Sequence, residues 1–158
     1  MPALKTNAMR ALENAGIAYT AHEYMPDDGA IDGISVAKKI GRSVDQVFKT
    51  LVTQGASRDY YVFVIPVAME LNLKAAAKAV GEKSVEMIHV ADINKVTGYI
   101  RGGCSPIGMK KPFRTVIDSN CILQRTIIVS AGKIGHQIEV APDDLAGLIG
   151  AKIEDIAY

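Results

Sequence analysis

Residues 48–67, FKTLVTQGASRDYYVFVIPV, decide the fold class of this chain. The segment 48–53 favours a strand, and the segment 60–67 is a second, strongly apolar strand. Between them, residues 55–59 contain Gly, Ser and Asp, which are typical of turns. Two strands joined by a loop of this length predict a hairpin. Because the second strand is apolar on both faces, we expect it to occupy the centre of a sheet.

Further helices and strands are predicted on both sides of this hairpin. Apolar periodicity and capping residues predict helices at 6–15, 34–40, 71–80 and 142–149, and short helical turns at 45–47, 84–87 and 92–96. Strand patterns occur at 17–24, 114–118, 124–130 and 136–140. Strands outnumber helices, and most neighbouring strands are predicted to be antiparallel. The sequence therefore predicts an α+β fold, in which helices lie outside a curved, mixed β-sheet.

Length and charge limit the classes of function. The chain has 158 residues, so we expect one domain over residues 1–158. Eighteen basic and seventeen acidic residues give a net charge of +1. A protein that holds a nucleic acid by phosphate contacts alone is usually more basic. Any role with RNA must therefore be local, weak or shared with a partner, and we expect no DNA partner.

The cysteines and the hydropathy indicate the compartment. Only two cysteines occur, Cys104 and Cys121, which argues against a disulfide framework and for a reducing environment. No apolar run reaches the length of a transmembrane helix, so we expect no membrane partner. The first residues form an amphipathic helix pattern without the apolar region and cleavage site of a signal peptide. We therefore expect a cytoplasmic protein.

The segment 98–108, GYIRGGCSPIG, is a candidate ligand-binding loop. Its glycines allow the backbone to approach a ligand closely, and Pro106 stiffens one end. Such a loop can direct several backbone N–H groups at one phosphate or one developing oxyanion. The alternative is a tight turn that binds nothing.

Lys49 is a candidate for binding an anion. In the strand 48–53, Lys49, Leu51 and Thr53 are predicted to face one way, and the alternate residues the other way. If both faces are covered, Lys49 points into a cleft, where its ammonium needs an anion, a carbonyl or a phosphate as partner. The alternative is a lysine on the solvent face of an edge strand.

Other chemical groups give weaker signals. Cys104 needs a neighbouring base or a helix N-terminus to become a nucleophile, so a small residue that fills the loop is the favoured interpretation. The histidines and cysteines lack the spacing of metal ligands, and the chain has neither a Walker A motif nor a Rossmann fingerprint. We therefore expect no metal and no cofactor.

Two groups of basic residues are candidates for phosphate contacts. One group follows the glycine-rich loop and the other lies along the predicted helix 71–80 and its exit. Both are equally compatible with ordinary solvent-exposed faces. The first group is Lys110, Lys111 and Arg114, and the second is Lys74, Lys78 and Lys83.

Taken together, these segments resemble the YbaK/EbsC group of aminoacyl-tRNA deacylases, which is related to the editing domain of bacterial prolyl-tRNA synthetases. The resemblance spans nearly the whole chain in order, and the lysine strand, the Gly-x-x-x-Pro loop and the tail are specific in combination. The matching segments are 22–24, 47–52, 71–78, 97–99, 102–108, 129–133 and 138–145.

The resemblance implies a fold and an activity. The fold is a mixed, partly barrel-like sheet flanked by helices, with the site in a cleft across the sheet. The activity is hydrolysis of the ester that links a wrong amino acid to the 3′ end of tRNA. In the YbaK branch the substrate is cysteinyl-tRNA, typically cysteine on proline tRNA, and a related branch removes alanine. The doubled glycine and the Ser-Pro pair of the loop look more like the cysteine branch.

The resemblance also implies site residues. Lys49 matches the key lysine of the family, Thr50 its neighbour, and Tyr24 a pocket tyrosine. Gly102 and Pro106 match the two ends of the Gly-x-x-x-Pro loop. On the far side of the site, the resemblance adds Ser130.

Two positions depart from the family pattern. The family often has an aromatic residue near position 32, where this chain has Asp32 beside Ile31. Where a polar or acidic residue is expected before the Ile-Glu pair, this chain has Gln137, which is retained as a substrate-binding candidate. Both differences concern the binding of the terminal adenosine rather than the reaction.

The implied mechanism uses the substrate itself. The thiol of the cysteinyl group can attack its own ester carbonyl, so that a thiolactone forms and the tRNA is released. The protein then supplies orientation and electrostatics. Lys49 acts as a charge, and the thiol of Cys104 is a bystander. The backbone N–H groups expected to hold the carbonyl oxygen are those of Gly102, Gly103, Cys104 and Ser105.

A tRNA with a mischarged 3′ end is thus the expected substrate, and prolyl-tRNA synthetase the expected protein partner. Three alternatives remain at this point. The first is an enzyme that acts on alanyl-tRNA(Pro), and the second is a non-catalytic module that binds a nucleotide or a 3′-terminal CCA end. The third is a hydrolase or redox protein that uses Cys104.

Overall fold

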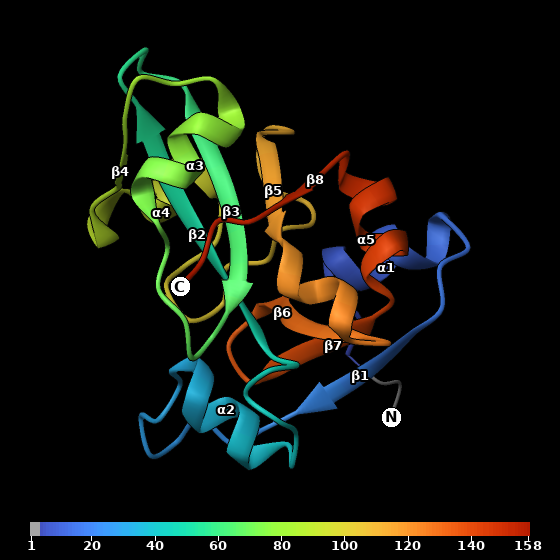
Figure 1. Cartoon of the computed structure of the whole chain (residues 1–158). Helices are drawn as coiled ribbons and strands as arrows, with labels where there is room; N and C mark the ends of the chain where they lie inside the picture. Colours follow the sequence, from blue (N-terminus) through green and yellow to red (C-terminus); the bar gives the residue numbers. More distant parts are fainter. Residues whose placement is uncertain (1–3) are drawn as a thin grey trace.

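The computed structural model describes residues 4–158 (Figure 1). Residues 1–3 of the expected domain lie outside the described residues. Within residues 4–158, the helices are α1 (Asn7–Asn14), α2 (Gly33–Lys39), α3 (Leu73–Val80), α4 (Ile93–Thr97) and α5 (Pro142–Ile149), with two 3₁₀ turns, η1 (Val90–Asp92) and η2 (Ser119–Leu123). The strands are β1 (Tyr19–Glu23), β2 (Phe48–Gly55), β3 (Tyr60–Pro66), β4 (Val85–Met87), β5 (Arg114–Asp118), β6 (Ile127–Lys133), β7 (His136–Val140) and β8 (Lys152–Glu154). The α+β class is therefore confirmed.

The larger sheet has five strands in the order β4-β2-β3-β5-β8. Its centre is the predicted hairpin, in which Phe48 of β2 lies opposite Pro66 of β3 and Gln54 opposite Tyr60. β5 joins the other edge of β3 in parallel, so β3 is central, as its apolar sequence predicts. β8 pairs with β5, also in parallel.

Two short strands correct the sequence prediction. Residues 84–87 were expected to form a helical turn, but Val85 and Glu86 pair with Gly55 and Gln54 at the open edge of β2. β8 was not predicted at all. Both strands have only three residues, too few for a period of two to show, and each forms because a neighbouring strand offers unpaired backbone groups.

The smaller sheet has three antiparallel strands in the order β1-β7-β6. β6 begins at Ile127, three residues later than predicted. The two sheets are separate, and an isolated parallel bridge between Val47 and Ile128 links the start of β2 to β6. The expectation of a partly barrel-like sheet is therefore wrong: the strands do not close into one continuous ladder.

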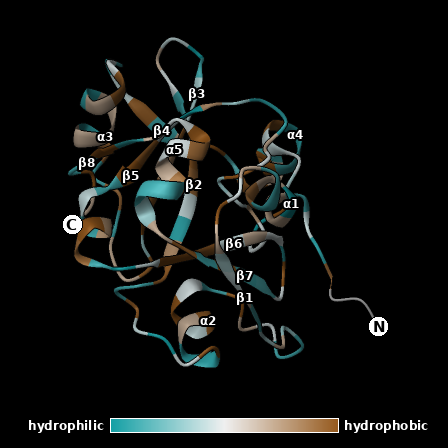
Figure 2. Cartoon of the chain, turned by 90° about the vertical axis from the view of Figure 1, so that its right-hand side faces the viewer, coloured by the Kyte–Doolittle hydropathy of each residue, from teal (hydrophilic) through white to brown (hydrophobic). Residues whose placement is uncertain are grey.

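The main core fills the space between the two sheets. Val62 and Val64 of β3 pack there with residues of β6 and β7 and with helices α1 and α5. α3 covers the other face of the large sheet, where Ala76 and Val80 contact the cluster of Phe63 and Ile65. Figure 2 shows α3 and α4 on opposite sides of the molecule.

Helix α2 covers the outer face of the smaller sheet near its link to β2. Ala37 packs there with Val47, Val67 and Ile128. A Cβ on Gly33 would lie 2.2 Å from Cγ1 of Val67, so only glycine permits this close approach. None of the helices within residues 4–158 is long and apolar enough to cross a membrane.

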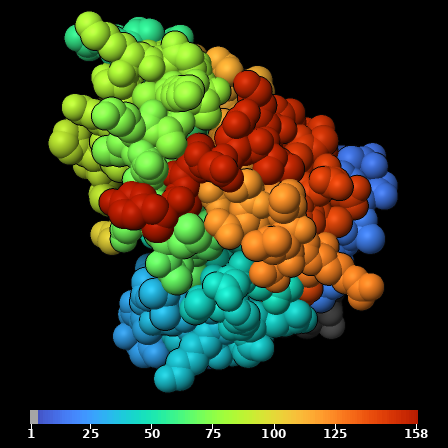
Figure 3. All heavy atoms as spheres, viewed as in Figure 1, coloured from blue at the N-terminus to red at the C-terminus, as the bar shows by residue number. Residues whose placement is uncertain are grey.

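The C-terminal segment crosses the surface of the molecule and ties distant elements together. Figure 3 shows it in red, running from α5 toward the green segment between β3 and α3. The backbones of Tyr158 and Glu70 exchange two hydrogen bonds, at 2.9 and 3.0 Å. Its last strand, β8, forms one edge of the large sheet.

Candidate active site

The register of the strands places three candidate side chains in one row with His22, which was not predicted as a site residue. Val47 and Ile128 form a parallel bridge, so the residues two positions further along β2 and β6 lie level with each other on the same face. Across the smaller sheet, β6 pairs with β7, and β7 pairs with β1. This row, the Lys49 row, consists of Lys49, Ser130, Gln137 and His22.

Lys49 is half-buried in this row. Its ammonium forms no hydrogen bond or ion pair with any of residues 4–158. A half-buried charge without a partner is costly unless a ligand supplies one. The arrangement fits an anion or a polarised carbonyl.

Thr50 lies on the other face of β2. Lys49 is opposite Ile65 and Thr50 is opposite Val64, so the two neighbours point to opposite sides of the sheet. The Thr50 hydroxyl is buried and has no hydrogen-bond partner among the described residues. The structure therefore does not place Thr50 in the Lys49 row, although both residues were expected in one site.

Tyr24 follows directly after β1 and is also unsatisfied. Its backbone N–H donates to the carbonyl of Gly135 at 3.0 Å, and the Lys39 ammonium lies 5.7 Å from its ring centre. The residue is only 7% exposed, and its hydroxyl has no partner within residues 4–158. A buried hydroxyl without a partner costs about 1–3 kcal/mol, so its place beside the Lys49 row calls for an explanation.

The glycine-rich loop closes against this region. A Cβ on Gly102, whose φ is +85°, would lie 2.7 Å from the Cδ1 atom of Ile31. A Cβ on Gly103 would lie 3.1 Å from the backbone nitrogen of Ile134. The loop thus packs against the segment before α2 and against the β6–β7 turn, and the positive φ at position 102 favours glycine there.

Three of the four expected backbone donors remain open. The N–H of Gly103 donates to the carbonyl of Ile100 at 3.0 Å, so it is used within the loop. The N–H groups of Gly102, Cys104 and Ser105 have no partner among residues 4–158. Pro106 and Ser105 are buried, which fixes this end of the loop.

Side chains within the loop hold its shape. The Tyr99 hydroxyl donates to the carbonyl of Ile107 at 2.5 Å, and the Ser105 hydroxyl accepts from the N–H of Ile107 at 3.2 Å. Ile107 itself is part of the main core. The open N–H groups therefore belong to a segment anchored on both sides, which suits preorganised electrostatic stabilisation.

The thiol of Cys104 is unsuited to nucleophilic attack. Burial raises its pKa to about 11, although a hydrogen bond with Thr97 acts in the opposite direction. At neutral pH the thiolate is therefore a very small fraction. This disfavours the alternative in which Cys104 is the nucleophile of a hydrolase or a redox protein.

Within residues 4–158, no group of three or more His, Cys, Asp and Glu is arranged to hold a metal.

Asp32 has a local role at the start of α2. Its carboxylate accepts from the backbone N–H of Ser35 at 3.1 Å and from the Ser35 hydroxyl at 2.7 Å, which caps the helix. The Ser35 hydroxyl and then its backbone N–H lower the pKa of Asp32. The residue that stands in place of the expected aromatic side chain thus orders the helix that borders the site.

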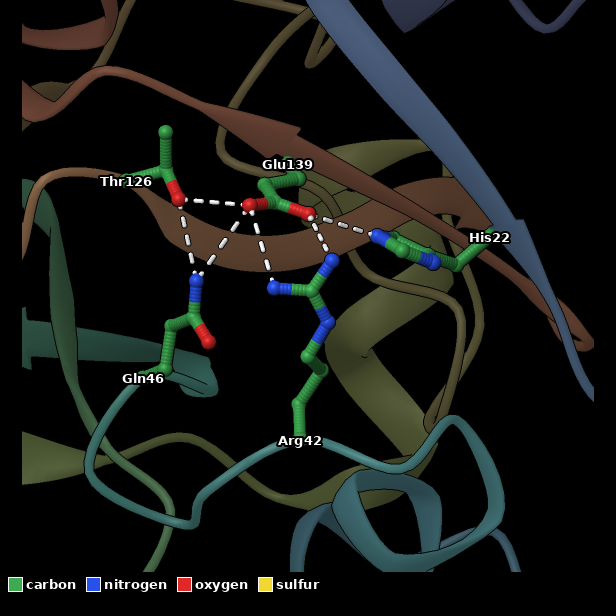
Figure 4. Close-up of polar contacts among 5 residues, drawn as sticks. All are labelled: His22, Arg42, Gln46, Thr126 and Glu139. Atoms are coloured by element: carbon green, nitrogen blue, oxygen red, sulfur yellow. Dashed lines mark hydrogen bonds and ion pairs between the residues drawn. The ribbon is translucent and has the colours of Figure 1, made fainter.

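Sequence reasoning missed a second polar group on the same sheet face. The Glu139 carboxylate, two residues along β7 from Gln137, accepts hydrogen bonds from four side chains, which Figure 4 shows converging on it. The distances are 2.7 Å to His22, 2.6 Å to Thr126, 3.3 Å to Gln46, and 3.1 and 3.4 Å to Arg42. We call these five residues the Glu139 cluster.

The pKa of Glu139 shows which interactions dominate in the cluster. Burial by itself raises the pKa, but hydrogen bonds from Thr126 and His22 and the charge of Arg42 outweigh burial, so that the pKa lies below its usual value. The cluster binds β1, β6 and β7 to the connection between α2 and β2. Its members are scattered from position 22 to position 139, so no local spacing in the sequence revealed them.

A well-defined cavity lies away from the predicted residues. It has a volume of about 310 Å³ and lies at the far end of the β2–β3 hairpin, where Gln54, Arg58, Tyr60, Glu86 and His89 are among its lining residues. None of the predicted site residues lines this cavity. Its mixed acidic and basic lining does not select one class of ligand.

Comparison with known proteins identifies the family. The model of the aminoacyl-tRNA editing domain matches residues 32–148. A protein of Enterococcus faecalis, described as a candidate Cys-tRNA(Pro)/Cys-tRNA(Cys) deacylase, EbsC, is 46% identical over 152 residues, which cover 96% of this chain and 93% of that protein.

Solved structures share the fold. A candidate trans-editing enzyme for prolyl-tRNA synthetase superposes with a TM-score of 0.83 at 24% identity, over 99% of both chains. A hypothetical protein superposes with a TM-score of 0.86 at 21% identity, over 94% of this chain and 97% of that one. From the family model and the close relative, it follows that this chain belongs to the aminoacyl-tRNA editing domain family.

Proposed function

We propose that this protein is a trans-editing hydrolase that removes cysteine from mischarged tRNA, with Cys-tRNA(Pro) as its main substrate. The observation that supports this most is the 46% identity, over nearly the whole chain, to the relative described as a Cys-tRNA(Pro)/Cys-tRNA(Cys) deacylase. Lys49, half-buried and without a partner among the described residues, agrees with a site for a phosphate or a carbonyl oxygen.

The proposed reaction begins with the thiol of the substrate. Its sulfur attacks the ester carbonyl carbon, the bond from that carbon to the ribose oxygen breaks, and the thiol proton ends on the ribose oxygen. The products are a cysteine thiolactone and a tRNA with a free terminal hydroxyl, and water then opens the thiolactone to cysteine. This route needs no nucleophile from the protein, which agrees with the raised pKa of Cys104.

The protein contributes charge stabilisation and orientation. The open N–H groups of Gly102, Cys104 and Ser105 are placed in a loop that is anchored on both sides, and we assign them to the oxyanion of the tetrahedral intermediate. One such donor is typically worth about 3 kcal/mol of barrier. Lys49 acts as a fixed charge on the same oxygen or on the terminal phosphate.

The remaining site residues are assigned to substrate binding. The buried hydroxyl of Tyr24 lacks a partner among the described residues, as a group reserved for a ligand would. Thr50 lies on the opposite face of β2 and is left out of this assignment. Ser130 and Gln137 lie opposite each other in the Lys49 row. Pro106 fixes the loop on the other side.

The proposal includes a partner and a place of action. A near-neutral chain holds tRNA weakly by charge alone, so a partner that carries the tRNA body, prolyl-tRNA synthetase, supplies the missing affinity. The reaction is placed in the cytoplasm, where aminoacyl-tRNA is made and used.

The test compares three esters on the same tRNA(Pro): cysteinyl, alanyl and S-methylcysteinyl. We expect rapid hydrolysis of the cysteinyl ester alone, abolished by Lys49→Ala. The S-methyl ester blocks the nucleophile by adding one methyl group to the sulfur, so its cleavage would rule out the thiol route. Cleavage of the alanyl ester would move the protein to the alanine branch. If no ester is cleaved faster than in buffer, the protein is a binding module for the 3′ end.

A further inference from the structure

The charges of this chain are unevenly distributed. Residues 93–117 contain five basic residues and no acidic residue, in a protein whose net charge is only +1. This segment includes α4, the glycine-rich loop and the start of β5. The loop that supplies the open N–H groups therefore lies within a strongly basic segment of the chain.

The fold gathers four of these cations on the surface and adds a fifth. The Lys110 ammonium donates to the carbonyl of Lys95 at 3.2 Å, so these two residues are neighbours. Lys133 lies close to this group because the β6–β7 turn packs against Gly103. A Cβ on Gly103 would lie 3.4 Å from the carbonyl carbon of Lys133. All five are exposed, and we call them the basic rim: Lys95, Arg101, Lys110, Lys111 and Lys133.

Arg114 does not belong to this surface. Its guanidinium donates to the carbonyl of Val80 at 3.1 Å and lies 5.9 Å from the ring centre of Tyr61. It is directed toward α3 and away from the loop. Of the basic group that follows the loop in the sequence, only Lys110 and Lys111 are therefore available there.

The basic rim is not neutralised within the protein. None of its five side chains forms an ion pair with a carboxylate of residues 4–158. On the α2 side of the site, by contrast, Lys39 pairs with Asp28 at 2.7 Å and Arg42 pairs with Glu139. Unpaired cations on one side leave a positive potential that attracts polyanions.

We propose that the basic rim binds the phosphate backbone of the RNA strand whose 3′ end enters the candidate site. This inference rests on the proposed function, and it identifies the surface that receives the acceptor stem of the tRNA. Arg101 directly precedes Gly102, so the rim begins beside the open N–H groups. The strand then continues over α4, the residues that follow the loop and the β6–β7 turn, where the other four cations lie.

The lysines of α3 and of the residues just after it provide a matched comparison. Lys74, Lys78 and Lys83 are also exposed and are equal in number to the rim lysines that the test removes. Yet α3 lies on the side of the molecule opposite α4 (Figure 2), and acidic residues follow it closely, at Glu82 and Glu86. The structure thus separates two basic groups that the sequence left equivalent.

The experiment compares Lys110→Ala/Lys111→Ala/Lys133→Ala with Lys74→Ala/Lys78→Ala/Lys83→Ala. Binding of uncharged tRNA(Pro) and of its acceptor-stem minihelix is measured over a range of KCl concentrations. The rim variant should bind at least tenfold more weakly at low salt, and its slope of log K against log salt should fall by about two to three. The α3 variant should match the wild type. Equal effects of both variants, or an unchanged slope, would overturn the proposal.

Turnover separates this inference from the proposed function. If the wild type cleaves Cys-tRNA(Pro), the rim variant should raise KM while kcat at saturation stays the same. If uncharged RNA binds through the rim but no ester is hydrolysed, the proposed reaction is wrong and the RNA-binding surface stands. If the ester is hydrolysed and the rim variant leaves KM unchanged, the RNA-binding surface is wrong and the proposed reaction stands. Thermal melting of both triple variants checks that the fold is intact, as exposed lysines lead us to expect.

Discussion

Two polar regions lie on adjacent rows of the same sheet face, and they differ in how their groups are satisfied. In the Glu139 cluster both carboxylate oxygens accept hydrogen bonds, from His22, Thr126, Gln46 and Arg42. In and around the Lys49 row the ammonium of Lys49 has no partner among the described residues. The buried hydroxyl of Tyr24, which directly follows β1, likewise has none there.

This difference separates structure from function by physical means alone. Burying a polar group costs little when the group is hydrogen-bonded, so a fully paired cluster needs no ligand and stabilises the contact between the elements that it joins. Unpaired groups lower the stability of the free protein and gain only when a ligand binds. The contrast favours a structural role for the Glu139 cluster, which includes His22. It agrees with the proposal that Lys49 binds the substrate.

The sharpest test of the comparison is the loss of the Lys49 charge. Lys49→Met keeps most of the aliphatic stem, so we expect the free energy of unfolding to change by less than about 0.5 kcal/mol. We expect kcat/KM for Cys-tRNA(Pro) to fall by roughly 10²- to 10³-fold, since a preorganised charge at the reacting centre is lost. Single-turnover hydrolysis and urea unfolding measure the two quantities. Lys38→Met, on the exposed face of α2, is the control and should change neither.

Removing the charge of Glu139 should lower the stability of the fold, in contrast to the loss of the Lys49 charge. Glu139→Gln leaves His22 and Arg42 without their anion, so we expect a loss of about 2 kcal/mol of stability. Urea unfolding measures it, with the exposed Glu23→Gln as control. If Glu139→Gln is as stable as the wild type, the cluster is not the fastening described above.

The same cluster makes a prediction about pH. The pKa of Glu139 is lowered in the folded protein, so its contribution is complete above the unfolded pKa of about 4.3 and is lost as pH falls through the folded pKa. The difference in stability between wild type and Glu139→Gln should therefore shrink from pH 7 toward pH 3. A difference that stays constant over this range would show that the carboxylate charge does not stabilise the fold.

The unpaired hydroxyls give a smaller and more discriminating effect. Tyr24→Phe removes a buried group without a partner, so stability should stay the same or rise by up to about 1 kcal/mol. The value of kcat/KM should fall about tenfold if the hydroxyl contacts the substrate. A clear loss of stability, seen by thermal melting, would mean that this hydroxyl is paired in the free protein. Thr50→Val removes an equally unpaired hydroxyl from the other face of β2, so it serves as the control and should leave kcat/KM unchanged.

The smallest effect is expected at Cys104. Its thiol pKa of about 11 keeps it protonated at neutral pH, so Cys104→Ala should retain activity within about twofold. Alkylation of the native protein should be slow at pH 7 and should accelerate only as the pH approaches 11. Loss of activity in the variant, together with fast alkylation at neutral pH, would restore the alternative of a catalytic cysteine.

The sequence predicted those features that depend on neighbours along the chain. The hairpin 48–67, the central position of its second strand and the loop 98–108 all follow from local apolar patterns and from glycine and proline. The strands β4 and β8 were missed because three residues are too few for a pattern. The partly barrel-like sheet was expected from the resemblance but is not supported, since within residues 4–158 one isolated bridge joins β2 to β6 and the two sheets do not close.

The candidate site shows the same limit. Lys49 and the loop could be singled out from the sequence, but the row that joins Lys49 to Ser130 depends on the bridge between Val47 and Ile128. That Thr50 faces away from Lys49 follows from strand alternation, yet which face belongs to the site needed the tertiary structure. The engagement of the Gly103 N–H inside the loop also became visible only there.

The parallel pairing of β8 with β5 has a consequence for the order in which the molecule is made. β8 follows every other strand in the chain, so on the ribosome the outer edge of β5 stays open until residues 152–154 have emerged. The buried carboxylate of Asp118 also lacks two of its hydrogen-bond donors until then, because it accepts from the backbone N–H groups of Ile156 and Ala157 at 3.0 and 3.1 Å. Until then a nascent chain carries an exposed strand edge, the kind of surface that chaperones shield and that neighbouring chains can join.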